Sequence, residues 1–131
     1  MKFSVEISKS ELSQMLNLAI GGSDWLGDLN VDECVETLIN GGTITITDKF
    51  ADYELDYYGK LHHKWNGESM EYEVTLADIN NGLAEIVKND ILSESRDYKA
   101  GCLQLLIDGY AYGSDADTLL QVIVFGDIEY I

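Results

Sequence analysis

Hydrophobic residues recur at intervals of three and four in several stretches of the chain, the spacing of one helix face. These are Leu12, Met15, Leu16, Ala19 and Ile20; Val31, Cys34, Val35, Leu38 and Ile39; Leu76, Ile79, Leu83, Ile86 and Val87; and Ala116, Leu119, Leu120, Ile123 and Val124. Each stretch follows a pair spaced for helix capping: Ser8–Glu11, Asn30–Glu33, Thr75–Asp78 and Ser114–Asp117. Glycines at 21–22, 41–42 and 126 follow three of the stretches. The pattern predicts helices between these caps and glycines.

The stretch CLQLLIDGYAYG is less clearly marked. A helix ending at Gly109 is the preferred interpretation, and a buried strand is the alternative, because a short apolar run fits both. The preceding residues 89–98, NDILSESRDY, are predicted to form a polar connection.

Strict alternation of apolar and polar residues predicts strands elsewhere. The segments are KFSVEI at 2–7, TITIT at 43–47, DYELDYY at 52–58, KLHHKW at 60–65, MEYEV at 70–74 and DIEYI at 127–131. Asn66-Gly67 between two of them is a type I′ turn signal, so the four central segments are predicted to form an antiparallel meander. Together the pattern predicts one α+β domain over residues 1–131. Its antiparallel sheet has about four to six strands, with three to four helices packed on one face.

The net charge indicates more about the class of partner than any motif in the sequence does. The 131 residues carry 24 acids against 8 bases, a net charge of −16. A field of this sign repels nucleic acid and anionic membranes, so neither direct nucleic-acid binding nor a membrane role is expected. It attracts basic protein surfaces, while solubility alone is the simpler explanation. No apolar run is long enough for a signal or a span, and Cys34 and Cys102 lack paired spacing, which favours a cytoplasmic protein with free thiols.

Residue combinations that perform catalysis or hold cofactors are not found. The adjacent pair His62-His63 must point to opposite faces of a strand, and a calcium loop starting at Asp108 would place tyrosines at ligand positions. The sequence contains no GxSxG and no GxGxxG. We therefore expect no enzyme, no cofactor and no metal site.

The carboxylates of two predicted strands form the candidate partner-binding site. Asp52, Glu54 and Asp56 alternate along one strand, and Glu71 and Glu73 alternate along another. Tyr58 and Trp65 lie next to strand breaks, where aromatic rings are often exposed. Carboxylates beside aromatic rings suit an arginine-rich partner, through bidentate hydrogen bonds and cation–π contacts.

Several segments resemble a family of small acidic proteins encoded by bacteriophages and prophages. They are Gly21, Gly22 and Trp25; GGTITI at 41–46; YEVTL at 72–76; and DADTLLQVIVFGDIEY at 115–130. Residues 50–69 are longer than the corresponding turn of that family, and Ile131 stands where the family ends in glycine. Small acidic phage proteins include inhibitors of host defence, among them anti-CRISPR proteins, several of which resemble DNA mimics.

The resemblance and the charge together lead to one hypothesis. The chain is expected to inhibit a basic, nucleic-acid-handling host protein in the bacterial cytoplasm. The most specific candidate is a CRISPR effector nuclease or its guide-RNA complex, blocked by acidic mimicry of DNA. The alternative is a non-inhibitory phage accessory or assembly protein, acidic for solubility, either monomeric or dimeric through a sheet edge.

Overall fold

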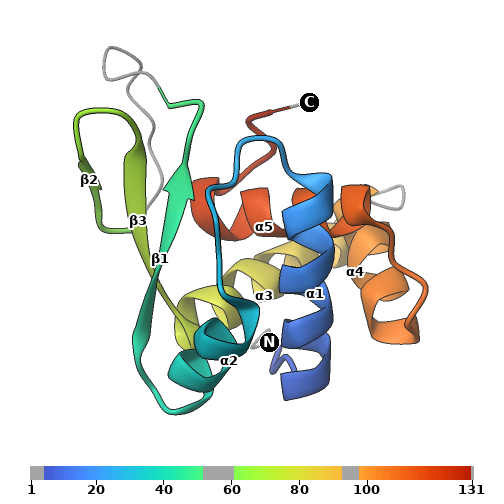
Figure 1. Ribbon diagram of the computed structural model, residues 1–131. Helices are drawn as coiled ribbons and strands as arrows, with labels where there is room; N and C mark the ends of the chain where they lie inside the picture. The colour runs from blue at the N-terminus through green and yellow to red at the C-terminus, as the bar shows by residue number, and fades with distance from the viewer. Residues whose placement is uncertain (1–4, 52–60, 93–97, 131) are drawn as a thin grey trace.

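A computed structural model describes residues 5–51, 61–92 and 98–130, and within them five helices accompany a three-stranded antiparallel sheet (Figure 1). In chain order the elements are α1 (Lys9–Gly22), α2 (Val31–Ile39), β1 (Thr43–Asp48), β2 (His63–Trp65), β3 (Met70–Thr75), α3 (Leu76–Leu92), α4 (Tyr98–Asp108) and α5 (Gly113–Phe125). The α+β class is confirmed, with fewer strands in these residues than predicted and more helices. None of the helices in the described ranges is both long and apolar enough to cross a bilayer.

The sheet order differs from the predicted meander. β3 lies in the centre and pairs antiparallel with both β1 and β2. Ile44 faces Val74 and Ile46 faces Tyr72, so β1 and β3 bury matching apolar rows against the helices. This shared burial favours a β1–β3 pair over pairing in chain order. The predicted strand at residues 52–58 lies outside the described residues.

The β2–β3 hairpin is confirmed, but its turn is not type I′. Asn66 donates its backbone N–H to the Ser69 carbonyl at 3.0 Å, which leaves Gly67 and Glu68 as the central residues. Only Gly67 of these two has positive φ, at 100°, whereas type I′ needs positive φ at both. The Asn66 side chain instead accepts the N–H groups of Glu68 and Ser69 at 2.9 and 2.8 Å.

Three of the four predicted helix caps are confirmed. The Ser8 hydroxyl accepts from the N–H of Glu11 at 3.1 Å, and the Glu11 carboxylate accepts from Ser8 in return at 2.9 Å. The Asn30 side chain accepts from Glu33 at the start of α2. Thr75 and Asp78 form the reciprocal pair at α3, with distances of 2.9 and 3.2 Å. Local hydrogen bonds of this kind need only the right spacing, so the sequence reveals them.

The fourth cap, Ser114–Asp117, is wrong. Asp115 takes that role, because its carboxylate accepts the N–H of Tyr112 at 2.8 Å in front of α5. Asp117 lies two residues further along and points inward, where it bonds to Ser23 and Trp25 in the α1–α2 loop. The N-cap residue of α5 is Tyr112. Tyrosine is not a usual N-cap, so the sequence did not indicate a cap at this position.

The remaining helix predictions are partly confirmed and partly wrong. α4 confirms the helical interpretation of residues 99–109, and Gly109 follows its last residue. Residues 89–92 are the end of α3 and not a connection. Ile20 and Ile39 were predicted in buried stripes but are 45% and 41% exposed, because each lies in the last turn of a helix that extends past the core.

Both predicted terminal strands are wrong in the residues that the structure describes. Residues 5–7 and 127–130 lie outside any strand. The Ile7 N–H is bonded to the Asn80 side chain at 2.9 Å, and the N–H groups of Glu129 and Tyr130 are bonded to the Gln121 side chain at 2.8 and 2.7 Å. Side-chain amides thus satisfy backbone groups that a strand would pair with its neighbour.

The most buried element is α5, which packs against α1, α3 and α4 (Figure 1). The predicted stripe Ala116, Leu119, Leu120, Ile123 and Val124 is buried as expected. Thr118, Gln121, Val122 and Phe125 are buried as well, so α5 is enclosed on all sides. Its last residue, Phe125, lies 5.0 Å from Trp25 and 5.4 Å from Tyr72 between ring centroids, which joins the helical layer to the inner face of the sheet.

Close approach of α1 to α5 depends on two glycines. A Cβ placed on Gly22 would lie 2.3 Å from the carbonyl oxygen of Gly113, at the first residue of α5. A Cβ on the neighbouring Gly21 would meet nothing within 4 Å. The Gly-Gly pair therefore has one residue required by packing and one that is not.

We expect Gly22→Ala to lower the free energy of unfolding by about 1–3 kcal/mol, because α1 and α5 must separate. Gly21→Ala should leave it unchanged or raise it by up to about 1 kcal/mol, since alanine favours the helix. Urea unfolding followed by circular dichroism compares the two variants. Equal stability of both would contradict the close contact.

Candidate functional site

The described part of the predicted acidic site is the outer face of β3. Glu73 lies opposite Thr45 of β1, and Glu71 lies opposite Thr47. Figure 1 shows the helices gathered on the other side of the sheet. Glu73 is exposed and Glu71 is half-buried, so both carboxylates border solvent. Alternate residues of a strand lie about 6.6–6.8 Å apart, which is the spacing of these two acids.

A lysine interrupts the acidic row. Lys64 of β2 is the cross-strand neighbour of Glu71 and is exposed on the same face. Opposite charges on facing residues of a sheet attract each other, so part of the charge of Glu71 is balanced within the protein. The Asn66 amide also lies 3.4 Å from the Glu71 carboxylate. Glu73 is therefore the more available of the two carboxylates.

The other predicted site residues do not join this face in the described part of the chain. Trp65 pairs with Met70 and points to the inner side of the sheet, where it packs half-buried against the core. The sheet thus places Trp65 on the face opposite to Glu71 and Glu73. Asp52, Glu54, Asp56 and Tyr58 lie outside the described residues.

The two histidines point to opposite faces, as strand geometry requires. His63 lies inside, with its ring centroid 5.3 Å from that of Tyr72 and its Nδ1 2.9 Å from the Leu61 carbonyl oxygen. His62 is exposed. Residues 5–51, 61–92 and 98–130 contain no group of three potential metal ligands.

Sequence reasoning missed a buried polar cluster around Asp117. One carboxylate oxygen, Oδ1, accepts from the Ser23 hydroxyl and from the Trp25 indole N–H, both at 2.7 Å. The other, Oδ2, accepts from the Gln121 amide at 3.0 Å. Trp25 is only 1% exposed, so Asp117 satisfies a donor that water cannot reach. The signal in the sequence was Asp117 and Gln121 at i and i+4, where Gln121 interrupts the apolar run from Leu119 to Phe125.

The C-terminal segment is held by the same cluster. The Gln121 amide donates to the Tyr130 carbonyl at 2.9 Å, and the Tyr130 hydroxyl donates to Asp48 at 2.7 Å. The Tyr130 ring stacks on Trp25 with centroids 6.2 Å apart. Residues from the α1–α2 loop, α5 and the C-terminal segment therefore form one network.

These contacts give four of the residues a role in the scaffold. Gly22 allows the α1–α5 contact, Trp25 and Asp117 form the buried hydrogen bond, and Tyr130 closes the network on Asp48. Each of these residues has a role in packing, and none is needed at the surface. These four residues therefore belong to the scaffold.

Burial raises the pKa of both thiols, at half-buried Cys34 and at buried Cys102. A raised pKa reduces the thiolate fraction at neutral pH and with it the nucleophilicity. Neither thiol has the properties of a catalytic cysteine.

Comparison of the chain with protein-family models, curated proteins and solved structures finds no match.

We expect Asp117→Ala to lower the free energy of unfolding by about 2–4 kcal/mol, because it leaves the buried Trp25 N–H without an acceptor. Asp24→Ala, at an exposed position in the same loop, should change it by less than about 0.5 kcal/mol. Urea unfolding monitored by tryptophan fluorescence measures both. A loss of stability in Asp24→Ala as large as in Asp117→Ala would contradict the buried role.

Burial raises the pKa of Asp48, although hydrogen bonds from Tyr130, Phe50 and Ala51 partly oppose the shift. The folded protein therefore binds this proton more tightly than the unfolded chain, and Asp48 contributes relative stability at low pH that is lost as pH rises through its folded pKa. Wild type should gain stability relative to Asp48→Asn as the pH falls from about 7 to about 4. Parallel urea titrations across this range test it, and a constant or shrinking difference contradicts it.

Proposed function

We propose that the protein is an inhibitor that binds a basic, nucleic-acid-handling protein through its acidic surface. The observation that carries the proposal is the outer face of β3, where Glu71 and Glu73 border solvent and none of the described helices covers them. A partner surface that normally grips phosphates offers arginines and lysines, which are complementary to these carboxylates.

Electrostatic steering supports this function. A net charge of −16 on 131 residues raises the local concentration of a basic partner and accelerates the encounter. Two lysines, Lys9 and Lys99, are already paired with Glu36 and Asp127 at 2.8 and 2.7 Å. Each pair neutralises one base and one acid, so the excess of acids that attracts a basic partner is unchanged.

The spacing of carboxylates along a strand matches the spacing of DNA phosphates only loosely. Carboxylates on alternate strand residues lie about 6.6–6.8 Å apart. Phosphates on one DNA strand advance about 3.4 Å along the axis. A single β-strand therefore offers about half the charge density of one DNA strand, so further acidic residues would be required. Asp52, Glu54 and Asp56 are the proposed source of these further charges.

A CRISPR effector nuclease, or its guide-RNA complex, is the proposed partner in a bacterial cytoplasm. Such nucleases hold DNA and the guide heteroduplex in positively charged channels and read the PAM with arginines. The resemblance to phage-encoded acidic proteins favours this class. Inhibition would follow from occupation of these arginines, so it needs no catalysis by the inhibitor.

One observation favours a second candidate, a phage accessory or assembly protein without inhibitory activity. Lys64 lies in the acidic row opposite Glu71, and threonines occupy the facing positions of β1. Mixed charge and hydroxyl groups are typical of an ordinary solvated sheet face. In this function the acidic charge serves solubility.

Charge reversal tests the sheet face. With Glu71→Lys and Glu73→Lys combined, binding to the CRISPR effector nuclease that the wild type captures should weaken at least about tenfold, because attraction becomes repulsion. The control combines Glu6→Lys and Asp108→Lys, which change the charge equally at exposed positions outside the sheet. Biolayer interferometry against purified effectors measures the affinities.

Salt and a second variant complete this test. Wild-type affinity should fall steeply between about 50 and about 500 mM salt, as the Debye length shrinks. Asp52→Lys, Glu54→Lys and Asp56→Lys together should remove binding and nuclease inhibition. Unchanged binding in both charge-reversal variants overturns mimicry by these acids, and absence of binding to every effector favours the accessory function.

A further inference from the structure

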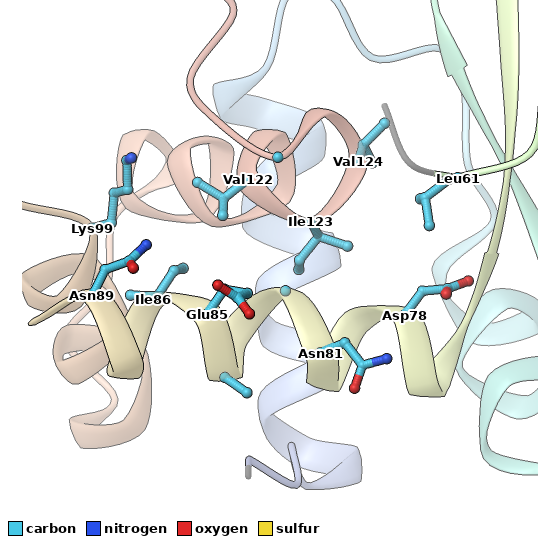
Figure 2. Close-up of a pocket in the computed structure, with 13 residues that line it drawn as sticks. Leu61, Asp78, Asn81, Glu85, Ile86, Asn89, Lys99, Val122, Ile123 and Val124 are labelled. Carbon is cyan, nitrogen blue, oxygen red and sulfur yellow. The ribbon is translucent and has the colours of Figure 1, made fainter. Parts of the chain in front are cut away.

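A groove runs between α3 and the C-terminal half of α5, on the helical side of the molecule (Figure 2). Its volume is about 530 Å³. Gly82 brings the two helices together at one point, since a Cβ there would lie 3.0 Å from the Ile123 backbone. Beyond this contact the helices enclose a groove whose apolar lining includes Ile86 and Val122.

Two polar side chains of α3 enter this groove without a partner. Glu85 and Asn89 lie one helical turn apart on α3, and both line the groove (Figure 2). Neither side chain makes a hydrogen bond or ion pair with the described part of the chain, and both are exposed. Their carboxylate and amide oxygens are free to accept hydrogen bonds.

The cation that lines the groove, Lys99, does not donate hydrogen bonds to Glu85 or Asn89. Lys99 is held by Asp127 at 2.7 Å, and this hydrogen bond lowers the pKa of Asp127. Lys88, three residues after Glu85 on the same helix, is not part of the lining. The Glu85 carboxylate therefore has no counter-ion from the groove itself.

We propose that this groove receives an arginine side chain of the basic partner, an inference that rests on the proposed function. The methylene stem would lie along Ile86 and Val122, and the guanidinium would donate to Glu85 in a bidentate pair and to the Asn89 oxygen. Arginine combines an apolar stem with a planar fork of donors, which is what these walls and acceptors match. An anionic ligand is disfavoured by Glu85 and by the net charge of −16.

A defined peptide tests the groove without any nuclease. The probe is a capped pentapeptide with a single arginine between glycines and serines, titrated into ¹⁵N-labelled protein at about 150 mM salt. The amide signals of Glu85, Asn89 and Val122 should shift together and saturate. Glu85→Gln should weaken the binding about fivefold, the upper range for an exposed ion pair.

Two controls decide between the groove and general charge attraction. Glu6→Gln removes the same charge at an exposed position outside both the groove and the sheet, and it should leave the peptide affinity unchanged. The same peptide with lysine should bind more weakly than the arginine peptide, because an ammonium lacks the planar fork. Shifts spread over the whole acidic surface, equal effects of the two Gln variants, or equal binding of both peptides would overturn the proposal.

The peptide experiment also separates this proposal from the sheet-face mechanism. If charge reversal at Glu71 and Glu73 has no effect on partner binding but Glu85→Gln weakens it, the groove stands and the sheet face does not. If the peptide fails to bind at the groove while the sheet variants abolish partner capture, the groove proposal is wrong and the proposed function remains.

Discussion

A single carboxylate, Asp117, joins parts of the chain that are far apart in sequence. It accepts hydrogen bonds from Ser23, Trp25 and Gln121, so it fixes the α1–α2 loop against α5. Gln121 in turn binds the backbone of the C-terminal segment. With the Trp25 ring held in this way, Phe125 and the inner face of the sheet have a defined surface to pack against. The helical layer and the sheet depend on this network for their relative position.

The network also separates structural residues from candidate functional ones. Gly22, Trp25 and Asp117 make buried contacts, and they are constrained by close packing and by the cost of unsatisfied buried donors. Glu73 and Glu85 are exposed, and neither takes part in the core. Their charge can change without loss of the fold, which is the physical condition for a surface that adapts to a partner.

Much of the helical structure could be predicted because its signals are local. Ser8 with Glu11 and Thr75 with Asp78 are capping boxes whose spacing is readable in the sequence, and the structure forms both. The candidate site was less predictable. Alternation placed Glu71 and Glu73 on one face correctly, but it could not show that Lys64 lies opposite Glu71 or that Trp65 faces inward, because both facts follow from strand pairing. The groove carrying Glu85 depends on how α3 meets α5, and no local pattern contains that information.

The sequence by itself determined the α+β class, the caps of α1, α2 and α3, the apolar faces of most elements and the strongly acidic character. These depend on residues within one or two turns of each other, or on composition alone. Only the tertiary structure decided the central place of β3, the inward role of Asp117 and the irregular path of the C-terminal segment. In each case the deciding hydrogen bonds and packing contacts join distant parts of the chain. The Trp25–Asp117 bond spans 92 residues, and a buried donor at that distance finds its acceptor only when the helices and the sheet have come together.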